Sequence, residues 1–285
     1  MSARRKLAWL AALAALLAGC STTQLAYDNA DTLLRWQARA YLDPGAEQSE
    51  ELDARIAAFH AWHRSAALPQ YAQLALEAAR RLERGLSRED LVWSYDSVRA
   101  QARESLRAAA GEIAGLLDRL GPEQVAHLEE RLAEDNRKFA RENLAGTPEE
   151  RRQRRARRQL ERFGEWLGEL SDAQAERVRQ YSERAPLLDE LRDAERRRRQ
   201  SEFLAMLRER GARRRLAGWA ADWESGRSPE YAAAARDGQE HYFRMLLELD
   251  AMLSAAQRRA AVSRLREYAA DFTVLARRVA EGPAR

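Results

Sequence analysis

The chain has very little cysteine, proline or glycine. Cys20 is the only cysteine among 285 residues, so no disulfide bond can form within the chain. With 7 prolines and 14 glycines, long stretches are free of helix-breaking residues. Residues branched at Cβ are scarce, which argues against β-sheet. Alanine, leucine, arginine and glutamate dominate instead, and all four are strong helix formers.

Long apolar runs are missing as well. The run Leu7–Leu17 falls short of the about 20 residues that a membrane-spanning helix requires. Charged residues make up 33% of the chain, and turn signals separate stretches with helical spacing of apolar residues. The sequence therefore predicts an all-α protein, an elongated multi-helix bundle with coiled-coil-like helices. Residues 25–285 form the helical body, which we expect to consist of one unit or of two subdomains, 25–146 and 147–285.

Motifs of common enzyme classes are absent. The sequence contains no P-loop, no GxSxG and no GxGxxG. His60 and His63 lie three residues apart and could share a metal ion, and His127 with Glu123 could add ligands if the fold brought them together. No HExxH motif or cysteine partner supports such a site. We expect packed or hydrogen-bonded histidines, no metal or cofactor, and no catalytic activity, with convergent carboxylates as the alternative.

The most informative motif lies at the N-terminus. Arg4, Arg5 and Lys6 precede an apolar run that ends in Leu17-Ala18-Gly19-Cys20. This order is typical of a bacterial secretory signal with a lipobox, in which small residues precede the cleaved bond. We therefore expect cleavage of residues 1–19 after Leu17, Ala18 and Gly19, lipidation of Cys20 including an acyl chain such as palmitate, and a tether over 20–24.

The residue after the lipidated cysteine bears on localisation. In Gram-negative sorting, aspartate there favours retention in the inner membrane, and this chain has Ser21. We therefore expect a protein held in the outer membrane by its N-terminal lipid and facing the periplasm. Several acyl chains on one residue meet the requirement for stable anchoring.

The formal net charge of +4 overstates the basic character of the mature chain. Three of these charges, on Arg4, Arg5 and Lys6, lie in the segment that we expect to be removed, which leaves about +1. Together with a periplasmic address, this balance excludes nucleic acid as an expected partner.

A short pattern, L-[SG]-x-x-Q, recurs at residues 120–124, 170–174 and 253–257, with a variant at 86–90. It predicts helix starts with a capping box, in which the glutamine returns to the amide of the N-cap residue and the leucine packs on the first turn. The pattern also resembles the LTxxQ motif of periplasmic stress chaperones, which are all-helical cradles for unfolded clients. Here serine or glycine replaces the usual threonine.

A second resemblance extends over most of the mature chain. It rests on Cys20-Ser21, on the segments 25–31, 62–64 and 68–71, and on the segments 124–129, 136–139 and 166–171. These are similar to an uncharacterised family of proteobacterial all-helical lipoproteins, a domain of unknown function. The resemblance implies lipidation and a helical fold, and it carries no activity and no site residues.

Arginine accounts for nearly all of the basic charge and forms dense runs. Arg151 to Arg158 contain six arginines and 191–215 another cluster. One interpretation is a solvated helix face. The other is a site for an anionic partner, such as lipid headgroups, acidic lipopolysaccharide or an acidic client. Its candidate residues are Arg151, Arg154, Arg155, Arg158, Arg196 and Arg199. Six arginines this close in sequence cannot all share one face.

The tryptophans, among them Trp36, are expected mainly in the core. The function that we expect is non-catalytic: binding, scaffolding or a chaperone-like role in the envelope, with an envelope protein, an unfolded client or an anionic lipid as partner. The alternatives are a structural or accessory subunit of an outer-membrane assembly and, less favoured, an enzyme of cell-wall or lipid substrates.

Overall fold

The computed structural model describes residues 22–278, and within this range every regular element is helical. The predicted all-α fold is therefore confirmed. Leu17, Ala18, Gly19 and Cys20 lie outside the described residues. The α-helices are α2 (Thr22–Asp28), α3 (Ala30–Leu42), α4 (Ala46–Trp62), α5 (Leu68–Glu83), α6 (Arg88–Leu117), α7 (Pro122–Phe139), α8 (Pro148–Leu167), α9 (Asp172–Arg184), α10 (Asp189–Arg208), α11 (Ala212–Ala221), α12 (Pro229–Ala251) and α13 (Ala255–Arg277).

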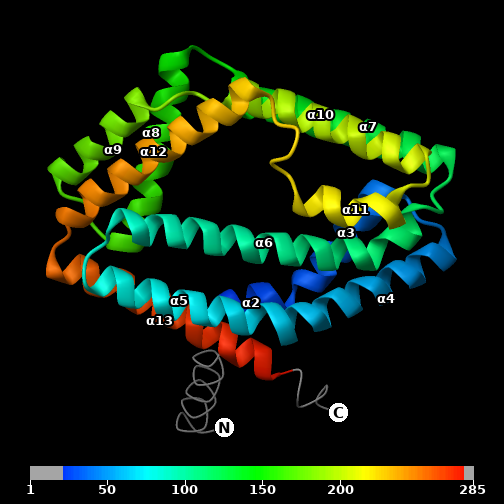
Figure 1. Cartoon of the computed structure of the whole chain (residues 1–285), viewed down its shortest axis with the longest axis horizontal. Coiled ribbons are helices and arrows are strands. Elements are labelled where there is room, and N and C mark those ends of the chain that lie inside the picture. Colours follow the sequence, from blue (N-terminus) through cyan, green and yellow to red (C-terminus); the bar gives the residue numbers. More distant parts are fainter. Residues whose placement is uncertain (1–21, 279–285) are drawn as a thin grey trace, which may run out of the picture.

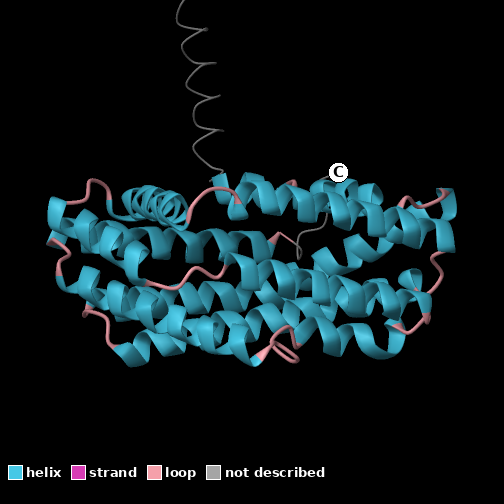
Figure 2. Ribbon diagram, turned by 90° about the horizontal axis from the view of Figure 1, so that it is seen from above, coloured by secondary structure: helices cyan, strands magenta, loops and turns pink. Residues whose placement is uncertain are grey.

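The helices form a closed frame around α6, which is 30 residues long (Figure 1). α13 packs along α5 on one edge, and α4 and α11 pack against α6. α8, α9 and α12 form one end, while α7 and α10 pair along the opposite edge. Seen from above, the body is longer than it is deep (Figure 2). The pairs α5–α13 and α7–α10 each join residues on both sides of position 146, where the sequence suggests a boundary.

Two π-helical segments interrupt the α-helical pattern. His63–Ala67 carries the chain from α4 into α5, and Ala140–Leu144 extends α7. No pattern in the sequence predicts either segment. In a π-helical turn the extra residue shifts the side chains that follow, which changes the face that they present.

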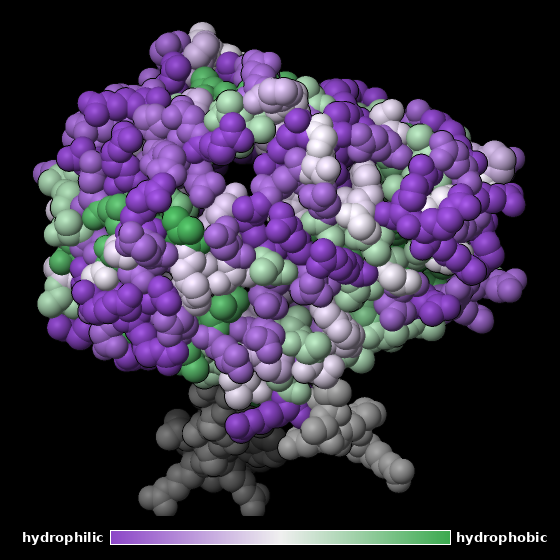
Figure 3. Space-filling view, viewed as in Figure 1, coloured by the Kyte–Doolittle hydropathy of each residue, from purple (hydrophilic) through white to green (hydrophobic). Residues whose placement is uncertain are grey.

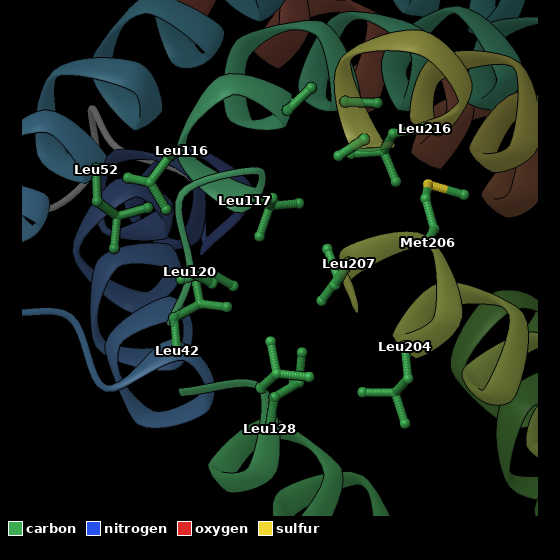
Figure 4. Close-up of a cluster of buried hydrophobic side chains, with 14 residues drawn as sticks. Leu42, Leu52, Leu116, Leu117, Leu120, Leu128, Leu204, Met206, Leu207 and Leu216 are labelled. Carbon is green, nitrogen blue, oxygen red and sulfur yellow. The ribbon is translucent and has the colours of Figure 1, made fainter. Parts of the chain in front are cut away.

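The larger core lies where the ends of α6 and α10 meet. Leucines of α6 and of the turn after it face Leu204, Met206 and Leu207 of α10 (Figure 4). α3 adds Leu42, and α4 adds Leu52, which is fully buried. A smaller core joins α9 to α12 through Val178, Met245 and Leu249.

Trp36 lies outside both cores, so its expected burial is wrong. It is 69% exposed. The core-facing side of α3 is supplied by Ala38, Tyr41 and Leu42. Because each residue turns the helix by about 100°, Trp36 lies on the opposite side.

Four helices begin with a capping box whose third helical residue is glutamine, and these glutamines pair. The Oε1 atoms of Gln124, Gln174 and Gln257 accept from their own N-cap amides. Gln48 does the same at the start of α4. Gln174 and Gln257 also hydrogen-bond each other in both directions, at 2.9 and 3.0 Å. Two helix N-termini are thereby joined at one end of the frame.

The same arrangement recurs at the other end. Gln48 and Gln124 bond each other in both directions, at 3.3 and 2.7 Å, and join the starts of α4 and α7. Gln124 also donates to the carbonyls of Leu42 and Asp43, which end α3. The two pairs lie at opposite ends of the long axis (Figure 1). The recurring motif therefore has a structural role in this chain, and its fourth member, Gly45–Gln48, was missed.

A third joint links the turn before α6 to the end of α12 and the start of α13. Buried Asp250 accepts from the backbone amide of Leu86 at 3.0 Å and from Arg258 at 2.7 Å. Arg258 also donates to the carbonyl of Leu82 at 2.6 Å. Both cores and all three joints lie within residues 22–278, so a chain that begins at Ser21 keeps all of these contacts.

The first described helix, α2, docks on the body through an aromatic cluster. The Tyr27 ring stacks on His60, with centroids 4.8 Å apart, and its hydroxyl lies 2.8 Å from Nδ1 of His63. Burial raises the pKa of Tyr27 to about 12 and lowers that of His63 to about 4. Asp28 pairs with Arg64 and Arg278, at 2.8 and 2.6 Å.

The first prediction concerns the glutamine pair at 174 and 257. Gln174→Ala should lower the free energy of unfolding by about 1–3 kcal/mol, because it leaves buried polar groups without partners. The double variant with Gln257→Ala should cost less than the sum of the single variants, with an interaction energy on the order of 1 kcal/mol. Urea unfolding measures both. Gln73→Ala, at an exposed position of α5, is the control, and strict additivity would contradict the pairing.

The second prediction concerns His63. Its pKa is about 6.5 in the unfolded chain and about 4 in the folded one, so between these values the unfolded state binds more protons. Stability is therefore present above pH 6.5 and lost as pH falls towards 4. Because the ring is partly exposed, we expect a loss on the order of 1–2 kcal/mol.

Thermal unfolding between pH 7.5 and 4.5 measures this loss. His63→Gln should flatten the profile, while Gln73→Ala at the exposed position of α5, which removes no titrating group, should leave it as in the parent chain. A parent Tm that does not change over this interval would be incompatible with a histidine held neutral. His60, whose pKa burial also lowers, adds in the same direction.

Candidate functional site

The arginines of α8 sort onto different sides of the helix. Arg151, Arg155, Arg158 and Arg162 follow one another at spacings of four, three and four residues, so they form one stripe. All four line the same cavity. Arg157, between them in sequence, lines a different hollow beside α9.

This arginine cavity has a volume of about 720 Å³ and lies between α6, α8, α9, the start of α10 and α12. Figure 3 shows the surface hollowed over the region between α12 and α6. Its guanidinium groups are those of Arg99, Arg151, Arg155, Arg158, Arg162 and Arg192, and its acidic side chain is Asp189. Most of the remaining wall is aromatic and aliphatic, with Tyr95, Val98, Tyr181, Leu188, Tyr242, Phe243 and Leu246, and Ser94, Gln159 and Gln239 add polar groups.

The arginines of the cavity differ in how they are compensated. Arg99 pairs with Glu224, and Arg151 pairs with Glu190. Arg155 donates to the carbonyls of residues 182, 185 and 186 at the end of α9, at 2.5 to 2.8 Å. Burial lowers the pKa of Arg155, and repulsion from neighbouring arginines acts in the same direction. Arg158 and Arg162 make no hydrogen bond or ion pair with any other residue in the described range.

The other three arginines selected from the sequence lie elsewhere. Arg154 donates to the carbonyl of Ala145 at 2.5 Å, next to the start of its own helix. Arg196 donates to Asn136 at 2.5 Å, and Arg199 to the carbonyl of Trp219 at 2.8 Å. The structure therefore brings together Arg151, Arg155 and Arg158 and separates the rest. Arg162 was missed, although its spacing of four from Arg158 places it on the same stripe.

The histidines form no ligand cluster. His60 and His63 surround Tyr27, and Nε2 of His127 lies 3.0 Å from the carbonyl oxygen of Ala40. Between residues 22 and 278, no three histidine, cysteine or acidic side chains come together in a way that could hold a metal ion.

A second hollow, the apolar groove, opens beside the larger core and has a volume of about 500 Å³. Six helices, α3, α4, α6, α7, α10 and α11, contribute to its wall. The apolar residues of the wall include Leu34, Tyr41, Ile56, Phe59, Leu106, Ile113, Leu132, Phe203, Leu216 and Trp219. Leu34 and Leu106 are 38% and 39% exposed. The charged residues of the wall, Arg55 and Glu112, face each other at 3.8 Å.

The comparisons with known proteins concern the middle of the chain. No curated protein and no solved structure matches this chain. No helix in the part of the chain that the structure describes is both long and apolar enough to cross a membrane. A family model, described as a family of unknown function (DUF6279), matches residues 40–232, from the end of α3 to the start of α12. This match covers more than half of the sequence and confirms the expected resemblance to a domain of unknown function. The chain belongs to the DUF6279 family.

Proposed function

We propose that this protein is a lipid-anchored envelope protein that binds non-native proteins without catalysis. The apolar groove is the observation that carries the proposal. Six helices contribute to its wall, and it leaves leucine, isoleucine and aromatic side chains of the larger core open to solvent on one side. Exposed apolar surface of this kind is typical of sites that bind proteins or ligands.

The occupant that we propose is an extended segment of an unfolded client. Such a segment presents apolar side chains together with backbone polar groups, and an open groove lets the backbone stay in contact with water. Because Arg55 and Glu112 pair with each other, the wall of the groove carries little net charge. It would therefore not favour client segments of one particular charge. Binding by burial alone suits many clients with a modest affinity for each.

The expected localisation of the protein supports the same role. The lipobox Leu17-Ala18-Gly19-Cys20 followed by Ser21 favours an anchor in the outer membrane and a body in the periplasm. α2 begins at Thr22, directly after these residues, so the body starts next to the proposed lipid. The resemblance of the helix-start motif to that of LTxxQ-type chaperones agrees with this proposal, although the glutamines pair internally in this chain.

The third prediction tests the groove. A form that begins at Ser21 should suppress the aggregation of a reduced insulin B chain. Leu34→Glu/Leu106→Glu should raise the concentration needed for half suppression about tenfold, because a buried charge opposes apolar contact by roughly 1–3 kcal/mol. The matched control is Leu76→Glu, whose parent leucine is 42% exposed but lies outside the groove.

Equal activity of the groove and control variants would contradict the proposal. Crosslinking of the lipidated protein in its native envelope distinguishes this proposal from the alternative function. One dominant partner in fixed proportion would indicate a subunit of an outer-membrane assembly, whereas a broad range of envelope proteins is the expected result.

The fourth prediction tests the anchor. Metabolic labelling with palmitate should mark the parent chain, and Cys20→Ala should abolish the label. Ser21→Asp should keep the label and move the protein to inner-membrane fractions, because only the sorting residue changes. Labelling that persists in Cys20→Ala would exclude lipidation at this cysteine.

A further inference from the structure

The arginine cavity combines uncompensated positive charge with an apolar wall. Arg158 and Arg162 lie four residues apart on α8 and have no carboxylate partner among the described residues. Like charges at this spacing destabilise a helix slightly. Arg99 and Arg151 pair with glutamates, and Arg192 lies 3.9 Å from Asp189, so the guanidiniums of the cavity without an ion pair are those of α8.

Polar atoms with unused capacity lie in the same wall. Nε of Arg151, Nε of Arg155 and Oε1 of Gln159 are buried and have no hydrogen-bond partner. Two of these three atoms are guanidinium donors. An anionic head in the cavity would add acceptors for the guanidinium groups that surround it.

The opposite side of the cavity is suited to an apolar chain. Val98 of α6 is 64% exposed, and Phe243 and Leu246 of α12 line the same space. Ser94 and Val98 also border a second cavity of about 490 Å³, whose wall includes Trp93, Trp166 and Phe272. At about 720 Å³, the arginine cavity itself falls within the range of about 300–1,000 Å³ that small-molecule sites occupy.

We propose that the arginine cavity binds an amphiphilic organic phosphate, with its head at Arg158 and Arg162 and its apolar chain between α6 and α12. A phosphate is favoured because it presents three oxygens, enough for two guanidiniums at once. Arg155, which is held by the end of α9, adds positive charge behind the head. This site is separate from the apolar groove and does not depend on the function proposed for it.

Isothermal titration of the form that begins at Ser21 tests the site with three probes: dodecyl phosphate and dodecyl maltoside, each below its micellar concentration, and inorganic phosphate. Dodecyl phosphate should bind at least about tenfold more tightly than either of the others, because it alone uses both the charge and the apolar wall. Equal binding of the two surfactants, or equally tight binding of inorganic phosphate, would overturn the proposal.

Matched variants locate the binding. Arg158→Gln/Arg162→Gln should weaken dodecyl phosphate binding about tenfold or more, while Arg157→Gln, which removes an exposed arginine of the same helix outside the cavity, should not. Since the like charges repel, the double variant should keep or slightly raise the parent Tm. Equal weakening by Arg157→Gln would mean diffuse attraction to α8 and would overturn the assigned site.

The phosphate can come from a bilayer lipid or from a soluble amphiphile, and a second arm distinguishes these sources. The protein is mixed with phosphatidylcholine vesicles that contain phosphatidic acid, and the vesicles are then removed by centrifugation. Phosphatidic acid that stays with the parent protein and is lost from Arg158→Gln/Arg162→Gln supports a bilayer source. Dodecyl phosphate binding without such extraction supports a soluble one.

Discussion

The frame depends on the way in which helix N-termini meet. At each end of the molecule two helices start side by side, and the positive ends of their dipoles would repel each other without compensation. A glutamine side chain both satisfies an amide at the start of its own helix and links that start to the neighbouring one. Its oxygen accepts from the N-cap amide of its own helix, and its NH₂ group donates to the partner glutamine and to a nearby carbonyl. A carboxylate could not donate, and a serine could not reach across.

Because these joints lie at the ends, the long helices between them are free to diverge. The result is a frame rather than a close-packed bundle, with one core at each end. Apolar and charged side chains along the middle of α6 and α8 then face open spaces, where a compact bundle would have covered them. The groove and the arginine cavity are both consequences of this geometry.

The sequence predicts the helices well and their partners poorly. Capping boxes, prolines at first turns and apolar spacing locate nearly every helix start, because these signals are local. Pairing of Gln174 with Gln257 depends on contacts 83 residues apart, which no local pattern encodes. Gln48 was overlooked because Pro44 and Gly45 precede its helix and no leucine stands directly before the glycine. The π-helical segments have no local signature at all.

The run of arginines on α8 shows the same difference between what local sequence predicts and what only the fold determines. Helical geometry requires that its six members face different directions, and it selects Arg151, Arg155 and Arg158 as one stripe once a reference face is known. That face is the one turned to the cavity that α8 shares with α6 and α12, and it exists only in the folded chain. Likewise, Gln257 lies beyond residues 40–232 of the family match, so the joint at one end of the frame uses a residue outside the matched region.

The closeness of α2 to the proposed lipid has a mechanical consequence. One residue, Ser21, separates Cys20 from Thr22, and the two residue steps between them span about 7 Å at most. α2 is itself clamped to the body by Tyr27, Asp28 and Arg278. If Cys20 carries the proposed lipid, this short spacing would keep the body close to the bilayer surface. Partners would have to come to the membrane to meet it.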